Sequence, residues 1–411
     1  MATLRRITDA VDDVLAEVRP MPAEPVPLVA ALGRVSAGRL VARDDVPGFT
    51  NSAMDGFAYR AADGGTAVAD GLRVMADIPA GTAPTVAIGR GEAARIMTGA
   101  PLPRGADTVV PVEQTSVVGE TVLLTTALPE GANVRAAGED VRAGSVVVEA
   151  GRVLRPADLG LLAAAGIAAV PVARRPRVAI IATGSELVAP EEPVGPGLIR
   201  NSNSFTACGQ ALEAGAEPVM LGVARDERDV TRRLLEEALR EDIVITSGGV
   251  SVGDYDFVKD VQDELGVERR FWGVRVKPGK PLAFGVREGT LVFGVPGNPV
   301  AAMTSFELFV RPAILSMLGR RDIWRPMLSA EAEEPVRPTK ERAELRRCRL
   351  TLDGRPRFSL TGAQGSGVLS SMTLADALLM LPTGFPGAPA GERFTVMLLE
   401  GSSTERPTLP D

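Results

Sequence analysis

Three carboxylates stand at or near the ends of predicted strands, where they could hold a metal ion beside a phosphate group. They are Glu186, Asp226 and Asp256. The carboxyl ends of parallel strands share one edge of a sheet, so we expect the three side chains to converge there. Taken singly, each acid could equally cap a helix or end a strand. Their convergence favours Mg²⁺, which takes one or two carboxylates together with substrate phosphates.

A glycine-rich turn between a strand and a helix offers a place for an anion. Residues 243–246 predict a buried strand, Ser247, Gly248 and Gly249 break it, and helical spacing follows from residue 254. Glycine lets a phosphate approach the backbone, and the N–H groups at a helix start favour an anion. A second turn, Pro296-Gly297-Asn298-Pro299, follows another strand and opens a long helix. Alone it predicts only a tight turn, but beside the glycine-rich loop it would form a second wall of a phosphate pocket.

Two lysines on a stiff backbone form the cationic element, Lys277-Pro-Gly-Lys280-Pro281. They could attract a small tetrahedral oxyanion or a phosphate as point charges. The alternative is a solvated surface loop. Asp55-Gly56 and Thr98-Gly99 also stand out, although spacing alone predicts only turns there.

Composition excludes several kinds of chemistry. The 411 residues contain no histidine, which removes Ser-His-Asp and Cys-His catalysis and His-ligated zinc. Cys208 and Cys348 are far apart and form no CxxC motif, so we interpret them as apolar fillers. A net charge of −7 argues against nucleic acid as a main partner, but a local cationic cluster could still bind an anionic substrate. No apolar run reaches about 18 residues and the start of the chain has no apolar signal core, so we expect no membrane span and a cytoplasmic location.

The order of predicted elements divides the chain into four domains. Residues 1–45 and 141–176 predict a helical domain, and the Val-, Thr- and Gly-rich residues 46–140 predict a β domain inserted into it. Residues 177–326 alternate strand and helix, which predicts a doubly wound α/β domain with a largely parallel sheet. Residues 327–411 predict a small separate β domain.

In these segments the chain closely resembles the MoeA-type molybdopterin molybdenumtransferases, a family that includes the matching domain of the eukaryotic scaffold protein gephyrin. Each segment is weak evidence alone, but all of them in this order are very specific. The segments are Val46-Pro-Gly-Phe-Thr-Asn-Ser-Ala-Met-Asp-Gly56, Arg95-Ile-Met-Thr-Gly-Ala-Pro101, Gly138-Glu-Asp140, Thr183-Gly-Ser-Glu-Leu187, Thr246-Ser-Gly-Gly-Val-Ser-Val-Gly253, Lys277-Pro-Gly-Lys-Pro281 and Pro296-Gly-Asn-Pro299.

The resemblance implies an enzyme that converts adenylylated molybdopterin and molybdate to molybdenum cofactor and AMP. It implies a helical N-terminal domain, an inserted β domain, a molybdopterin-binding α/β domain and a C-terminal small β-barrel domain. It also implies an elongated homodimer, with the active cleft between the α/β domain of one subunit and the β insertion of the other. Transient contact with the molybdopterin adenylyltransferase is a further expectation.

The family's site residues are carried over to the matching positions of this chain. Asp55 and Thr98 would line the cleft from the partner subunit, and Glu186, Asp226 and Asp256 would be the acids of the α/β pocket. Mg²⁺ would be held by Asp226 or Asp256 and by pyrophosphate oxygens. The phosphate and pterin sites would be shaped by Ser247, Gly248, Gly249, Pro296, Gly297, Asn298 and Pro299, and the best molybdate candidates are Lys277, Lys280, Arg347 and Ser371.

Three positions depart from the family pattern. Asn201 stands where relatives commonly have Asp, Asp376 lies where the usual motif is Ala-Asn-Gly, and Asp254 replaces a frequent Glu. Two other functions stay open at this point: a molybdopterin adenylyltransferase, which shares the α/β domain, and a non-catalytic molybdopterin carrier or scaffold. The β insertion and the last domain argue against the first, and the retained acids argue against the second.

Overall fold

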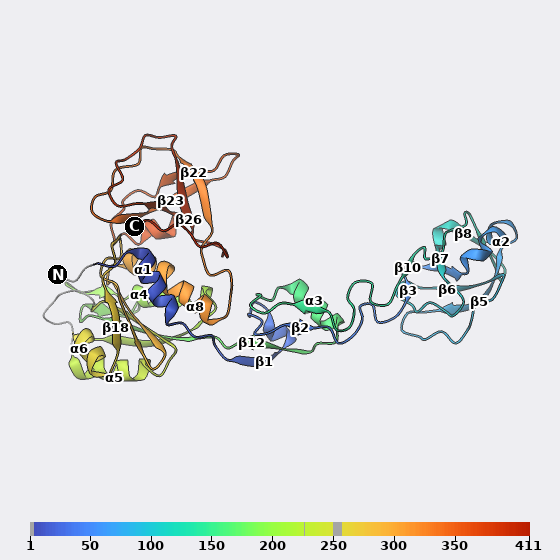
Figure 1. Ribbon diagram of the computed structural model, residues 1–411, viewed down its shortest axis with the longest axis horizontal. Coiled ribbons are helices and arrows are strands. Elements are labelled where there is room, and N and C mark those ends of the chain that lie inside the picture. The colour runs from blue at the N-terminus through green and yellow to red at the C-terminus, as the bar shows by residue number, and fades with distance from the viewer. Residues whose placement is uncertain (1–3, 226, 250–256) are drawn as a thin grey trace.

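The computed structural model describes residues 4–225, 227–249 and 257–411, which form an elongated molecule with three bodies in a row (Figure 1). One end holds an α/β domain with a β-barrel beside it. A small unit of short strands and one helix lies in the middle, and the inserted β domain forms the far end. The residues predicted to share one site therefore belong to domains at opposite ends of the elongated molecule.

The α/β domain is built on a six-stranded sheet whose first four strands are parallel. Residues 178–182 and 243–247 are all buried, as expected for strands covered on both faces. The last two strands each run antiparallel to the strand before them. The order is β16 (Glu217–Ala224), β13 (Arg177–Thr183), β17 (Ile243–Ser247), β21 (Thr290–Val295), β20 (Ala283–Arg287) and β18 (Glu268–Trp272).

Helices cover both faces of this sheet, which confirms the predicted doubly wound α/β fold. Ile180 and Ile245 pack in one core with α1, α4, α7 and α8, whereas Ile181 and Val244 pack on the opposite face against α5 and α6. Helix α1 therefore packs on the α/β domain, although its residues were predicted within the helical N-terminal domain. The bounds are α1 (Ile7–Ala16), α4 (Asn203–Glu213), α5 (Arg228–Ala238), α6 (Phe257–Glu264), α7 (Pro299–Ser305) and α8 (Arg311–Met317).

Helices α7 and α8 are joined by a π-helical turn, Phe306–Val310. Among the described residues, the run Pro299–Met317 is the one helix long and apolar enough to cross a membrane by length and composition. It is 89% buried inside the protein, so it is the core helix of this domain.

The middle unit and the inserted β domain carry the chain away from the sheet. The middle unit contains α3 (Pro156–Ala164) and two antiparallel strand pairs, β1 (Ala23–Pro27) with β12 (Ala169–Ala173) and β2 (Leu40–Val41) with β11 (Val146–Val148). The inserted domain has a six-stranded sheet with an apolar core on each face. Its order is β7 (Thr108–Pro111), β4 (Gly56–Tyr59), β6 (Glu92–Ile96), β5 (Leu72–Ile78), β9 (Thr121–Leu124) and β8 (Thr115–Val118).

The last domain is a closed five-stranded barrel, as the fold prediction expected. Its strands pair in the ring β22–β24–β23–β25–β26–β22. A short strand of the α/β domain, β19 (Val276–Lys277), pairs with β23 and so fastens the barrel to the sheet domain. The barrel strands are β22 (Met327–Ala332), β23 (Ala343–Thr351), β24 (Arg357–Leu360), β25 (Ala377–Leu381) and β26 (Arg393–Leu398).

Asp411 caps the first helix from a position distant in sequence. Its carboxylate accepts hydrogen bonds from the N–H of Ile7 (3.0 Å) and the hydroxyl of Thr8 (2.9 Å), and it pairs with Arg6 at 2.6 Å. Burial alone would raise the pKa of Asp411, but the bonds from Arg6 and Thr8 outweigh it and lower the pKa.

We expect Asp411→Ala to lower the free energy of unfolding by about 1 kcal/mol at pH 7, because a helix cap is lost. Since the folded-state pKa of Asp411 is lowered, this stabilisation is present above the unfolded pKa of about 4 and is lost as the pH falls through the folded pKa. Thermal unfolding of wild type and variant between pH 7 and pH 3 measures both effects. An equal difference in melting temperature at both pH values would contradict the assigned role.

Candidate active site

The α/β end of the site is formed where β13, β17 and β21 end. The side-chain amide of Asn203, at the start of α4, donates to Ser247 Oγ (2.7 Å) and to the carbonyl oxygen of Gly297 (2.8 Å). Asn203 therefore ties the glycine-rich loop to the Pro296–Pro299 turn. Asn203 was missed as a site residue in the sequence, where it marks only the start of a helix.

Glycine is required where these loops meet. Gly248 has a φ of +92°, and a Cβ there would lie 2.6 Å from Thr183 Oγ1. Gly184 has a φ of +137°, and a Cβ there would lie 2.3 Å from the Glu186 carboxylate. At Gly248 a side chain would collide with Thr183, including its backbone oxygen, and at both positions the positive φ disfavours any residue other than glycine.

A buried cation lies next to these loops. Arg347, on β23, is only 1% exposed. Its Nε donates to Ser371 Oγ (3.0 Å), and its guanidinium also donates to the carbonyl oxygens of Gly365 (3.0 Å) and Ala363 (3.3 Å). No carboxylate in the described part of the chain forms an ion pair with it. Burial lowers the pKa of the Arg347 guanidinium, because removal from water disfavours the charged form.

The loop held by Arg347 also reaches the start of α7. The Val300 N–H donates to the Ser366 carbonyl oxygen (3.1 Å), and Ser371 Oγ donates to the Val368 carbonyl oxygen (2.6 Å). The Arg347–Ser371 pair of the barrel therefore lies next to the Pro296–Pro299 turn of the α/β domain.

Ser305 is a further polar group that the sequence did not reveal. It is 1% exposed, and within the described residues its Oγ has no hydrogen-bond partner. Gly279 lies in the middle of residues 277–281, the segment between Lys277 and Pro281 that we call the lysine loop. A Cβ on Gly279 would lie 3.1 Å from that Oγ. Ser305 directly precedes the π-turn, a feature found frequently at functional sites. Only a serine within an apolar helix marks this position in the sequence.

Lys277 ends the short strand β19 and Lys280 follows three residues later; both side chains are exposed, and Lys277 is already paired. Lys277 Nζ donates to Glu344 Oε1 at 2.9 Å, and Arg346 pairs with the same carboxylate at 2.7 Å. Burial would raise the pKa of Glu344, but these two cations outweigh it and lower the pKa. No contact joins either lysine side chain to Arg347 in the part of the chain described here, so the structure brings together Arg347 and Ser371 but not all four predicted residues.

Asp55 and Thr98 contact each other in the inserted β domain, which forms the far end of the molecule (Figure 1). Asp55 Oδ1 accepts a hydrogen bond from the Thr98 N–H at 2.6 Å. This bond and the nearby charge of Arg95 lower the pKa of Asp55. Gly56 follows in a central strand, where a Cβ would lie 1.8 Å from the Val110 carbonyl oxygen, so the turn that presents Asp55 depends on glycine.

Two departures from the family pattern have structural roles. Asn201 is 8% exposed and exchanges hydrogen bonds with Ser204 at the start of α4. The Asp376 carboxylate accepts a hydrogen bond from the Leu350 N–H at 2.9 Å. Asn201 therefore stabilises the start of the helix that carries Asn203, and Asp376 stabilises the end of a barrel strand.

The two predicted metal ligands, Asp226 and Asp256, lie outside the described residues. Among residues 4–225, 227–249 and 257–411, no group of three or more Cys, Asp or Glu side chains could hold a metal ion. At the edge of the sheet the described side chains provide oxygen donors, Glu186 and Ser247. This donor chemistry suits Mg²⁺, which prefers oxygen ligands.

We expect Asn203→Ala to raise the KM for the substrate about fivefold, because two hydrogen bonds that hold the loops together are lost, each worth about 0.5–1.5 kcal/mol. Steady-state kinetics measure the change. Leu212→Ala, at an exposed position of the same helix, is the matched control. An unchanged KM in Asn203→Ala would contradict a positioning role.

Comparison with known proteins supplies the family context. Family models match residues 5–166 (MoeA N-terminal region, domains I and II), 179–316 (probable molybdopterin binding domain) and 329–399 (MoeA C-terminal region, domain IV). Molybdopterin molybdenumtransferase 2 of Mycobacterium tuberculosis is 39% identical over 382 residues, which cover 90% of this chain and 94% of that protein. Molybdopterin molybdenumtransferase of Staphylococcus aureus is 34% identical over 408 residues, with 98% and 97% coverage. The crystal structure of a MoeA protein from Pyrococcus horikoshii superimposes with a TM-score of 0.84 at 33% identity, covering 97% of this chain and 100% of that one.

Proposed function

Because the chain belongs to the MoeA family of molybdopterin molybdenumtransferases, we propose that it inserts molybdate into adenylylated molybdopterin, with release of AMP. The observation that carries this proposal is Arg347, a guanidinium 1% exposed and bonded only to Ser371 and to backbone carbonyls within the described residues. A buried charge without a counter-charge is costly, so such a site favours an anion. Molybdate is a compact dianion whose oxygens accept hydrogen bonds from guanidinium and hydroxyl groups.

In this proposal the barrel and the lysine loop bind the oxyanion, and the α/β loops bind the pterin and its pyrophosphate. Arg347 and Ser371 would hold molybdate, with Lys277 and Lys280 as cations at its approach. The buried, unpaired Ser305 hydroxyl, close to Gly279, would supply a further hydrogen bond. Ser247 to Gly249 and Pro296 to Pro299 would place the phosphates, and Glu186 would lie at the same edge.

Asp226 and Asp256 are the proposed magnesium ligands. When bound, Mg²⁺ would neutralise charge that develops on the pyrophosphate oxygens as the phosphoanhydride bond breaks. The proposal is supported by their sequence positions, since Asp226 follows β16 by two residues and Asp256 directly precedes α6.

We expect chelation of divalent cations to abolish AMP release and added Mg²⁺ to restore it, because the pyrophosphate would otherwise keep its full charge. Asp226→Asn and Asp256→Asn should each need more Mg²⁺ for half-maximal activity. Full activity of metal-free protein would contradict a magnesium site, and so would an unchanged Mg²⁺ requirement in both variants.

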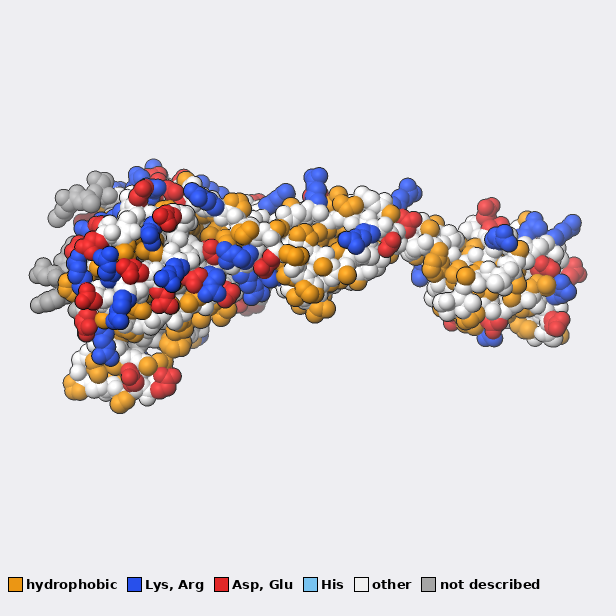
Figure 2. Space-filling model, turned by 90° about the horizontal axis from the view of Figure 1, so that it is seen from below, with side chains coloured by type: hydrophobic (Ala, Val, Ile, Leu, Met, Phe, Trp, Pro, Cys, Tyr) orange, Lys and Arg blue, Asp and Glu red, His pale blue; other side chains and the backbone are white. Residues whose placement is uncertain are grey.

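We further propose a homodimer in which Asp55 and Thr98 complete the cleft of the partner subunit. Support comes from the elongated shape, in which the inserted β domain that carries Asp55 and the barrel that carries Arg347 lie at opposite ends of one chain (Figure 1). Further support comes from the surface of the middle unit, where charged groups are sparser than on the α/β end (Figure 2). Val29 and Leu32 of this unit are 87% and 51% exposed, and exposed apolar side chains of this kind suit an interface.

The test of the function is AMP release from adenylylated molybdopterin, measured with and without molybdate. We expect release to depend on molybdate and to be accompanied by molybdenum cofactor. Formation of adenylylated molybdopterin from ATP and molybdopterin would indicate an adenylyltransferase instead. Tight binding of adenylylated molybdopterin without turnover would indicate a carrier or scaffold.

A further inference from the structure

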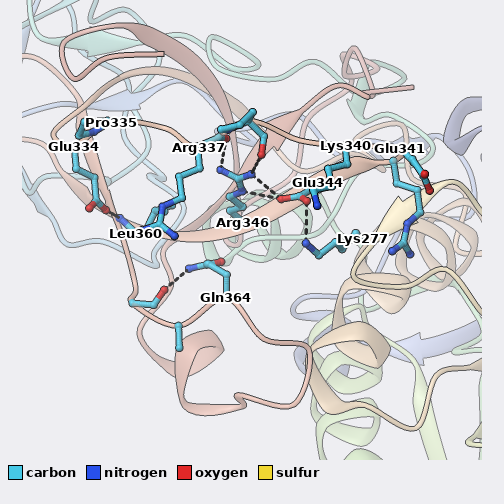
Figure 3. A pocket seen from close by; sticks show the side chains of 14 residues that line it. Lys277, Glu334, Pro335, Arg337, Lys340, Glu341, Glu344, Arg346, Leu360 and Gln364 are labelled. Atoms are coloured by element: carbon cyan, nitrogen blue, oxygen red, sulfur yellow. Dashed lines mark hydrogen bonds and ion pairs between the residues drawn. The ribbon is translucent and has the colours of Figure 1, made fainter. Parts of the chain in front are cut away.

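A cleft of about 760 Å³ lies where the lysine loop of the α/β domain meets the barrel (Figure 3). Lys277 lines it from the α/β domain, and most of the residues between 334 and 346 and between 360 and 364 line it from the barrel. Five cationic side chains and three carboxylates face the cleft, although the chain as a whole is acidic. None of the lining residues in the described part of the chain is aromatic.

The partners of these charged groups leave a surplus of cations. Glu344 is shared between Lys277 (2.9 Å) and Arg346 (2.7 Å). The Arg346 guanidinium also donates hydrogen bonds to the backbone carbonyl oxygens of Arg337 (2.7 Å) and Pro338 (3.1 Å). Glu344 therefore already neutralises part of the charge of Lys277 and Arg346.

Three cations at the rim are not used in this way. Arg337 and Lys340 are exposed and make no ion pair within the described residues, and Arg342 reaches only the Val276 carbonyl oxygen at 3.5 Å. Glu341 is the one unpaired carboxylate among the described lining residues, since Glu334 accepts a hydrogen bond from the Leu360 N–H at 2.9 Å. The open part of the cleft thus carries net positive charge.

The cleft is separate from the Arg347–Ser371 pair. Arg346 and Arg347 are neighbours on β23, and successive side chains of a strand point to opposite faces. Gln364 stands between the two places: its amide accepts from the Arg347 N–H (2.9 Å) and donates to the Arg347 carbonyl oxygen (3.1 Å). An anion in the cleft would therefore contact neither Ser371 nor the Arg347 guanidinium.

We propose that this cleft is a second anion site, which binds a doubly charged tetrahedral oxyanion through Arg337, Lys340 and Arg342. Guanidinium and ammonium groups are suited to such anions, and the volume leaves room for a hydrated one. On binding, the anion competes with Glu344 for the Lys277 ammonium. Two sources share this chemistry, inorganic molybdate before it reaches Arg347 and the phosphate group of AMP, and the choice of these two rests on the proposed function.

The test is equilibrium dialysis of the full chain against molybdate, with bound molybdenum measured by elemental analysis. We expect two molybdate ions per chain in the wild type. Arg337→Gln/Lys340→Gln and Arg347→Gln should each retain one, and the triple variant should retain none. The control is Arg233→Gln/Arg321→Gln, two exposed arginines outside the cleft, which changes the net charge equally and should still bind two.

A parallel arm uses AMP in place of molybdate in the Arg347→Gln background. The cleft site is supported if Arg337→Gln/Lys340→Gln weakens the binding of molybdate or of AMP at least tenfold. The anion whose binding is weakened is then the ligand of the cleft. The proposal is overturned if the wild type binds one molybdate ion and Arg337→Gln/Lys340→Gln leaves AMP binding unchanged. Because dialysis requires no turnover, an enzyme inactive in AMP release would count against the proposed function and leave this test valid.

Discussion

Arg347→Gln is expected to lower molybdate-dependent AMP release by at least about 100-fold, equivalent to about 2.7 kcal/mol of transition-state stabilisation. Glutamine can still donate a hydrogen bond toward Ser371, but it removes the buried charge that molybdate would neutralise. Wild-type protein should also become more thermally stable as molybdate is added, because a ligand that binds only the folded state stabilises it. The variant should lose the contribution of this site to that stabilisation.

The matched control for this experiment is Arg349→Gln. Arg349 lies on the same strand two residues away but is exposed, and its Nε donates only to the Leu374 carbonyl oxygen at 3.3 Å. Its activity and its response to molybdate should be near those of the wild type. Equal activity of Arg347→Gln and Arg349→Gln would contradict the role of Arg347 in molybdate binding, on which the proposed function depends.

Mixing two inactive variants is expected to restore activity. Asp55→Asn and Arg347→Gln should each be inactive alone, because each removes a required side chain from one side of both clefts in the dimer. If the cleft is shared between subunits, unfolding and refolding an equal mixture should give about a quarter of wild-type activity, since about half of the dimers are mixed and each of these holds one intact cleft. AMP release by the refolded mixture measures this recovery.

Two control mixtures separate restoration from incomplete inactivation. Asp55→Asn with Thr98→Ala places both changes on the same side of the cleft, and so does Arg347→Gln with Ser371→Ala. Neither mixture should exceed its more active member. Failure of Asp55→Asn with Arg347→Gln to recover, in a sample shown to contain mixed dimers, would place both groups in the same subunit's site and contradict the shared cleft.

The sequence predicted those parts of the fold that depend on local pattern. The apolar-rich runs at 177–183 and 243–246 predicted central strands, because strands of a sheet covered on both faces are largely apolar; residues 178–182 and 243–247 are indeed buried. The turns at Gly248 and Pro296–Pro299 were predicted for a similar reason, since glycine and proline restrict the backbone in known ways. These local signals place the phosphate loops at one edge of the sheet.

The remaining features depend on contacts between distant segments. The Lys277–Glu344 pair joins residues 67 positions apart, and it exists because β19 lies beside β23. The importance of Ser305 depends on a π-turn in the following residues and on Gly279 packing against it, neither of which leaves a pattern in the chain. Helix α1 has the apolar face of an ordinary surface helix, so its sequence does not specify which domain it covers.

The hydrogen bond from Thr98 to Asp55 has a consequence for how rates should be compared across buffers. It keeps that carboxylate ionised well into mild acid, as Lys277 and Arg346 do for Glu344. The chain contains no histidine, the side chain whose unperturbed pKa lies nearest to neutrality. A slope in a pH–rate profile between about pH 6 and pH 8 would therefore not come from Asp55 or Glu344, whose pKa values are lowered from the ordinary acidic range.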